Sequence, residues 1–182
     1  MHRKALLDLL ADYGMRFPEE MAACERLIDF VRSHEQCFSR QLEIGHVTGS
    51  AWILDTNGER VLLTHHRKLD IWVQPGGHAD GDHDILRVAR REATEETGLP
   101  QLQLACEGLF DIDIHAIPAR GTAPAHDHYD CRFAFQVNGS EAYMVSDESH
   151  DLQWIPLHQV IEYNNEASLQ RMVTKTADLK GR

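Results

Sequence analysis

The sequence contains no apolar run of about 18 residues or more, which is the length that marks a membrane span. Its N-terminal segment is interrupted by Asp8 and Asp12, whereas a secretory signal needs an unbroken apolar core. We therefore expect neither a membrane partner nor a signal peptide, and we expect a cytoplasmic protein.

Closely spaced cysteines and an excess of positive charge are also missing. The four cysteines, Cys24, Cys37, Cys106 and Cys131, form no CxxC pair, which favours reduced thiols over zinc ligands or a disulfide framework. There are 18 Lys and Arg residues against 29 Asp and Glu residues, for a net charge of −11. Such a balance argues against binding a nucleic-acid polymer, because neutralising phosphates requires a basic surface. An anionic ligand would need cations to bridge it to the protein.

The 182 residues, 42% of them apolar, predict one globular domain with an N-terminal appendage. Helices are expected over residues 3–13 and 18–34, where leucines and other apolar residues recur at helical spacing and Pro18 suits a first helical position. We expect residues 1–40 to form a helical extension and residues 41–182 to form the main domain.

Beyond residue 46 the pattern changes from helix to strand. Two strands flank Asn57-Gly58, which predicts a hairpin with a type I′ turn, and a third strand is expected over residues 70–74. Pro75-Gly76-Gly77 should break strand and helix alike. Further segments are predicted as a helix over residues 84–97 ended by Gly98, strands over residues 102–110, 111–114, 129–137 and 153–155, a long loop over residues 115–128, and a last helix from 157 or 165 to 177. This order indicates an α/β sandwich with a mixed sheet.

Three glutamates, Glu92, Glu95 and Glu96, lie within one turn of the predicted helix. Their mutual repulsion costs an isolated helix about 0.2–0.5 kcal/mol per pair. On a helical projection they adjoin the apolar stripe, where ionised groups need partners. A hard divalent cation such as Mg²⁺ or Mn²⁺ would supply one, because it takes oxygen ligands. The alternative is a solvated acidic face, supported by an ion pair from Arg91 to Glu95.

The spacing around these glutamates resembles a known family motif. Gly77, five residues, His83, seven residues and then Arg91-Glu92-Ala93-Thr94-Glu95-Glu96-Thr97-Gly98-Leu99 are similar to the Nudix box, GX5EX7REUXEEXGU. One position departs from the pattern, since His83 stands where the box has its first Glu. The preceding hairpin and Trp72-Val73-Gln74-Pro75-Gly76-Gly77 also resemble the family, so the likeness extends over residues 46–177.

The resemblance implies a Nudix α/β/α sandwich and a hydrolase that cleaves the diphosphate linkage of a nucleoside diphosphate joined to another moiety. It further implies that Glu92, Glu95, Glu96 and the Gly77 carbonyl bind Mg²⁺ or Mn²⁺, while Arg91 orients the glutamates. A diphosphate repels an incoming hydroxide, and metal ions offset that repulsion and activate water.

The general base is left open by the resemblance, because the family draws it from the box in some members and from a later loop in others. In the second case the candidate is Glu148, which precedes a predicted strand. Its alternative reading is an ordinary polar turn.

Substrate contacts are predicted at two places. His65, His66, Arg67 and Lys68 form a cationic corner suited to phosphate, or else a solvated hairpin exit. His126 and His128, in the predicted long loop, have side chains suited to metal or phosphate, although a polar loop without ligands is the alternative. Trp52 and Trp72 are candidates either for stacking on a base or for the core.

Two other functions share this fold. A nucleotide sensor without hydrolytic activity would tend to lose box glutamates, but this chain keeps all three. An isopentenyl diphosphate isomerase would need a cysteine in the segment that leads to the metal site, where this chain has Gln74-Pro75-Gly76-Gly77. The N-terminal helices are expected to serve as a homodimer contact or a lid.

Overall fold

The computed structural model describes residues 2–121, 124–147 and 149–179. Its helices are α1 (Lys4–Arg16), η1 (Pro18–Glu20), α2 (Met21–Ser33), α3 (Ile85–Thr97), η2 (Leu157–Gln159), α4 (Val160–Tyr163) and α5 (Ala167–Leu179). Its strands are β1 (Gly45–Leu54), β2 (Arg60–His66), β3 (Ile71–Val73), β4 (Gly76–His78), β5 (Leu102–Leu104), β6 (Asp111–Ile117), β7 (His126–Val137) and β8 (Ser149–Pro156). Within these ranges no helix is both long enough and apolar enough to cross a membrane.

The strands form one mixed sheet whose central pair, β1 and β7, runs parallel over the full length of β1. On one side β1 pairs antiparallel with β2, which in turn pairs with β3 and β8. On the other side β7 pairs antiparallel with β5 and β6. The short strand β4 pairs antiparallel with β1 at residues 48–50. Because β1 is central, both of its faces are covered and all of its residues are buried.

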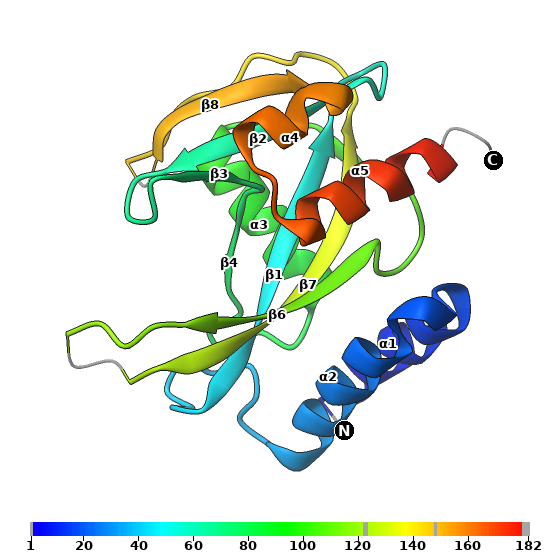
Figure 1. Cartoon of the computed structure of the whole chain (residues 1–182), viewed down its shortest axis with the longest axis vertical. Helices are drawn as coiled ribbons and strands as arrows, with labels where there is room; N and C mark the ends of the chain where they lie inside the picture. The colour runs from blue at the N-terminus through cyan, green and yellow to red at the C-terminus, as the bar shows by residue number, and fades with distance from the viewer. Residues whose placement is uncertain (1, 122–123, 148, 180–182) are drawn as a thin grey trace.

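Helices cover the two faces of the sheet, as the α/β/α prediction required (Figure 1). Alternate residues of β1 separate the two cores, since side chains in a strand point to opposite faces. Val47, Ala51 and Ile53 belong to the core that contains Val88 and Ala89 of α3. Trp52 belongs to the opposite core, with apolar residues of α5. The indole Nε1 of Trp52 donates to Thr176 Oγ1 at 2.9 Å, so this tryptophan is a core residue and does not face a ligand.

The N-terminal residues form two helices, as predicted, and these pack beside β6 and β7 (Figure 1). Leu6 and Leu10 of α1 and Leu27 of α2 share one buried cluster with residues of the sheet. Phe30 stacks on Tyr129 of β7 with ring centroids 3.7 Å apart. The extension is therefore packed against the domain by an apolar face, while the boundary at residue 41 stays a prediction.

The β1–β2 hairpin is confirmed, but its predicted type I′ turn is wrong. Of the two central residues only Gly58 has a positive φ, of 67°. The connection is longer, because the Asp55 carboxylate accepts hydrogen bonds from the amides of Glu59 and Arg60 at 2.7 and 3.2 Å. The Asp55 carboxylate thus provides hydrogen bonds for backbone amides that would have bonded to backbone carbonyls in a two-residue turn.

The predicted long loop over residues 115–128 is also wrong at both ends, because residues 115–117 and 126–128 extend β6 and β7 into a hairpin. His115 pairs with His128 and Ile117 pairs with His126 in an antiparallel ladder. Polar and histidine residues mask the alternation that reveals a half-buried strand. The hairpin places the histidines of both strands side by side.

Two other strand predictions need correction. The strand expected over residues 102–110 stops at Leu104, and residues 105–110 then loop out around Gly108, whose φ is 70°. Gly76-Gly77, expected to break all regular structure, instead forms β4 with His78. Here pairing with β1 overrides the low strand propensity of glycine, which is a tertiary effect that local pattern does not contain.

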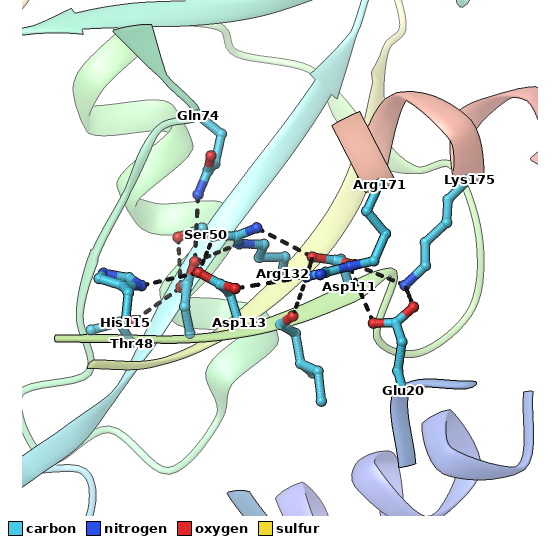
Figure 2. A network of polar contacts seen from close by, with 12 residues as sticks. Glu20, Thr48, Ser50, Gln74, Asp111, Asp113, His115, Arg132, Arg171 and Lys175 are labelled. Atoms are coloured by element: carbon cyan, nitrogen blue, oxygen red, sulfur yellow. Dashed lines mark hydrogen bonds and ion pairs between the residues drawn. The ribbon is translucent and has the colours of Figure 1, made fainter. Parts of the chain in front are cut away.

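A buried network of charges joins the middle of the sheet to α5 and to the N-terminal helices (Figure 2). Asp111 of β6, which is fully buried, accepts hydrogen bonds from Arg132, Arg171 and Lys175 at 2.7–3.2 Å. The Lys175 ammonium also lies 2.5 Å from Glu20. Asp111 thus contacts all three cations, which also pair with Glu20, Asp113 or Asp130.

Replacing Asp111 with asparagine is expected to lower the free energy of unfolding by about 3–5 kcal/mol, because the cations around it would lose the one counter-charge that all three share. Urea denaturation measures the change. Asp8→Asn is the matched control, since Asp8 pairs with Lys4 on the exposed surface of α1 and exposed pairs contribute little. Equal effects of the two substitutions would contradict the assigned role of Asp111.

Candidate active site

Helix α3 carries the motif glutamates, and its two ends are defined by the local sequence. The Asp84 carboxylate caps the N-terminus by accepting from the Arg87 amide at 3.1 Å. Gly98 ends the helix in the left-handed conformation, with φ of 68°, and its amide donates to the Thr94 carbonyl. The sequence predicted the end of the helix at Gly98 and its start near Asp84, but not the cap by the Asp84 carboxylate. The two ends fix the register of the helix and therefore which face the glutamates occupy.

The C-terminal half of α3 lies directly against the glycines of β4. A Cβ added to Gly77 would sit 2.6 Å from Cδ of Glu92, so no larger residue fits without moving that carboxylate. A Cβ added to Gly76 would sit 2.7 Å from Cβ of Ser50. The amide of Gly76 donates to Oε1 of Glu96 at 2.8 Å. The missing side chain of Gly77 thus leaves room for the Glu92 carboxylate, and the amide of Gly76 binds the Glu96 carboxylate.

Arg91 joins α3 to β4 on the same side. Its guanidinium donates to Glu92 Oε1 at 2.6 Å and to the backbone carbonyl of His78 at 2.9 Å. The hydrogen bond with Glu92 raises the pKa of Arg91 above its ordinary value. Glu95 lies 4.0 Å away. A role of Arg91 in orienting the glutamates stays a prediction.

The three glutamates differ in exposure. Glu96 is 8% exposed and the Glu92 side chain 18%, whereas the Glu95 side chain is 64% exposed. They share one end of the site, next to Gly76 and Gly77, but within the described residues their oxygens are not gathered around a single point. Two of the carboxylates are therefore largely shielded from solvent, and that of Glu95 is exposed.

His83, which replaces the first Glu of the box, contacts the N-terminal extension. Its ring centroid lies 4.5 Å from that of His2 and 5.1 Å from that of Phe38. A groove of about 750 Å³ runs beside it, between α1 and residues 80–87. The departure from the motif thus lies on the face covered by α1, away from Gly77 and Glu92.

The predicted cationic corner forms at the turn between β2 and β3, where much of its charge is already paired. His65 stacks on Trp72 with ring centroids 5.0 Å apart, and its Nε2 lies 2.9 Å from Asp70. Arg67 donates to the carbonyl of Ser149 at 3.1 Å. The Nδ1 of His66 accepts from the amide of Lys68 at 3.2 Å. A role of these four residues in binding substrate stays a prediction.

The other predicted substrate residues, His126 and His128, lie on β7 in the hairpin with β6. Figure 1 shows this hairpin and the β2–β3 turn as two separate projections, so the structure does not bring the two predicted groups together. It brings His128 beside His46 and His78 instead. Sequence reasoning missed this pairing, which depends on β1, β4 and β7 being neighbours. Glu148, the candidate base, lies outside the described residues.

Fold and site together define an α/β/α sandwich in which one helix presents glutamates to a glycine pair at a strand end. A profile of the NUDIX domain matches residues 46–176 of this chain. The chain therefore belongs to the NUDIX family, the Nudix hydrolases, which generally use divalent metal ions.

Three individual proteins that resemble this chain have less than 30% sequence identity to it. The m7GpppN-mRNA hydrolase NUDT17 of Xenopus laevis is 29% identical over 103 residues, which are 53% of this chain and 34% of that relative. An Ap4A hydrolase from C. elegans, solved as a binary complex, superposes with a TM-score of 0.61 at 22% identity, covering 75% of this chain and 98% of its own. A Nudix-family hydrolase from Clostridium perfringens superposes with a TM-score of 0.55 at 26% identity, covering 74% and 97%. The chain thus spans about a third of the length of the first of these.

Gly77→Ala is expected to lower the free energy of unfolding by about 1–3 kcal/mol, because the new methyl group would collide with the Glu92 carboxylate. In the background of Glu92→Ala the same substitution should cost less, since the collision is removed. A double-mutant cycle by urea denaturation measures this coupling. Strictly additive effects would contradict the close contact.

Proposed function

We propose that this chain is a hydrolase, dependent on Mg²⁺ or Mn²⁺, that cleaves the diphosphate linkage of a nucleoside diphosphate joined to another moiety. The observation that supports it most directly is the contact between α3 and β4, where Glu92 and Glu96 lie against Gly77 and Gly76. Carboxylates held beside backbone in this way are unusual for a merely solvated helix face.

A divalent cation fits the groups at this place. Glu92, Glu95 and Glu96 offer only oxygen atoms, the donors that Mg²⁺ and Mn²⁺ prefer. The missing Cβ at Gly77 leaves the strand backbone accessible to Glu92, so that the Gly77 carbonyl is a suitable additional ligand. Arg91 lies within ion-pair distance of both Glu92 and Glu95, so it keeps their carboxylates on the same side of α3. A bound cation would neutralise phosphoryl oxygens and activate water for attack.

The side chains around the site position those ligands. Arg91 holds Glu92 through a charged hydrogen bond and is itself fixed by the His78 carbonyl. The amide of Gly76 holds Oε1 of Glu96 at 2.8 Å. Glu96 is thus held by the backbone of β4 directly, and Glu92 is held through Arg91, which restricts the movement of both carboxylates. Such pre-organisation lowers the entropic cost of reaching the reactive geometry.

The substrate class is proposed from the family and from its relatives. Names of the matched proteins refer to an mRNA cap and to Ap4A, both of which contain nucleotides linked through phosphates. The negative charge of this chain agrees with a small anionic substrate that is bridged by cations and disagrees with a long polyanion. A nucleoside diphosphate derivative meets these conditions.

Replacing Glu92, Glu95 or Glu96 singly with glutamine should lower kcat at least about 100-fold, because each loses a charged ligand of the cation. Phosphate release, coupled to a phosphatase, measures turnover of cap analogues, Ap4A and nucleoside diphosphate sugars with Mg²⁺ or Mn²⁺. The exposed Glu107, on the loop after β5, supplies the control Glu107→Gln, which should keep full activity.

Chelation should abolish the activity of the unmodified protein as completely as the glutamate substitutions. If the unmodified protein binds one of these nucleotides by calorimetry without turning it over, the sensor function replaces the hydrolase. If turnover persists in all three glutamine variants, the site lies elsewhere.

Glu148 is proposed as the general base. Glu148→Gln should then lower kcat by about 10²–10⁴, the usual contribution of a general base, while Mn²⁺ affinity stays nearly unchanged. Steady-state kinetics and Mn²⁺ titration separate the two effects. A loss of less than about tenfold would assign the base to the glutamates of α3.

A further inference from the structure

Five histidines gather where β1, β4, β6 and β7 meet, on the sheet face opposite α3. They are His46, His78, His115, His126 and His128, and neighbouring ring centroids lie 4.8–5.4 Å apart. The strand register explains this cluster. His46 pairs with His128 across the parallel β1–β7 ladder, and His78 pairs with Thr48, two residues along on the same face. No motif contains all five, and neither the family resemblance nor the proposed hydrolysis uses them as a group.

Three of these rings, His46, His78 and His128, converge. One nitrogen from each lies within 4.8 Å of the others, and this is the only set of at least three such ligands found in the described part of the chain. In a tetrahedral zinc site with bonds of about 2.0–2.1 Å the nitrogens would be about 3.4 Å apart. The rings would therefore need to move inward by roughly 1 Å, a distance that small changes in side-chain torsion supply.

Several ring nitrogens of this cluster are buried without a hydrogen-bond partner, which is unfavourable for the folded state. His46 is 2% exposed, and although the Leu42 carbonyl is near, neither of its ring nitrogens forms a hydrogen bond. The Nε2 of His128 is likewise buried without a partner. A buried polar group without a hydrogen-bond partner lowers the stability of the fold. A ligand that accepts lone pairs would recover this free energy.

The charge state of the rings favours a cation. Burial, followed by the neighbouring histidines, lowers the pKa of His46 to about 4 and that of His128 to about 3. Both imidazoles are therefore neutral near pH 7 and keep a free lone pair, the form in which histidine binds metal ions. Protonated rings would instead favour a phosphate or carboxylate. The convergence of three ring nitrogens, with those of His46 and His128 buried and unpartnered, favours a metal cation.

The metal class follows from the donors. Three imidazole nitrogens without a carboxylate suit zinc and its neighbours in the transition series, whereas Mg²⁺ and Mn²⁺ prefer oxygen. The cluster is also distinct from the glutamates, because side chains alternate along β4. Gly77 faces Glu92 on α3, and His78 projects to the other face of the sheet.

We propose that His46, His78 and His128 form a transition-metal site for Zn²⁺ or a similar ion, separate from the glutamates of α3. Ligands from β1, β4 and β7 would cross-link three strands of the sheet. Three protein ligands leave a fourth position open to water or to a further ligand. His78 also connects the site to α3, because its carbonyl accepts from Arg91. Metal binding here requires no hydrolytic activity.

The test uses full-length protein without a histidine tag, stripped of metal and titrated with Co²⁺ and then Zn²⁺. One Co²⁺ per chain should bind with the intense visible absorption of a low-coordinate nitrogen site, and Zn²⁺ should displace it. His46→Gln and His128→Gln should each weaken Zn²⁺ binding at least about tenfold. The exposed His158, in η2, provides the control His158→Gln, which should bind Zn²⁺ normally.

Two further measurements make the result decisive. X-ray absorption of the Zn²⁺-loaded unmodified protein should show imidazole scattering, and this holds even if a histidine variant fails to fold. Glu92→Gln should retain the Zn²⁺ site while losing the proposed hydrolysis. The proposal is overturned by an absence of stoichiometric binding, by an oxygen-only shell, or by Zn²⁺ binding that Glu92→Gln removes and the histidine variants keep.

Discussion

The close approach of α3 to the glycines of the sheet is the constraint on which the rest of the structure depends. A Cβ at Gly49 would lie 3.1 Å from the backbone of Ile85 and Ala89, and a Cβ at Gly77 would overlap Glu92. Without side chains at these positions the helix can sit directly on β1 and β4. That contact buries the apolar side of α3 and brings its glutamates to the strand end.

The opposite face of the sheet is apolar around Trp52, but it is polar around Thr48 and Ser50. Asp130, fully shielded inside, accepts from Thr48, Ser50 and Arg132, and the network continues through Asp111 to Lys175 (Figure 2). Burial by itself would raise the pKa of Asp130, but Arg132 and Ser50 together hold it below its ordinary value. The carboxylate therefore stays ionised. In this part of the sheet, ion pairs thus take the place of apolar packing. The network joins α5 and the N-terminal helices to the sheet, and one end of it lies beside the histidine cluster.

Local sequence predicted those features whose causes are local. Gly98 marks the end of α3 and Asn57-Gly58 marks a hairpin, because the residues responsible are adjacent in the chain. The predictions failed where partners are distant. Strand β4 exists because β1 lies beside it, and β6 extends to Ile117 because β7 pairs with it. The type I′ turn failed because Asp55 offered the backbone a competing cap.

The sequence by itself determined the family, the α/β/α class and the grouping of Glu92, Glu95 and Glu96, because the box lies within one continuous segment whose spacing is read directly. The tertiary structure alone decided what those glutamates touch and which histidines meet. His46, His78 and His128 are 32 and 50 residues apart in the chain, and only the β1–β4 and β1–β7 registers bring them together. Proximity of that kind is a property of strand order, which no local pattern encodes.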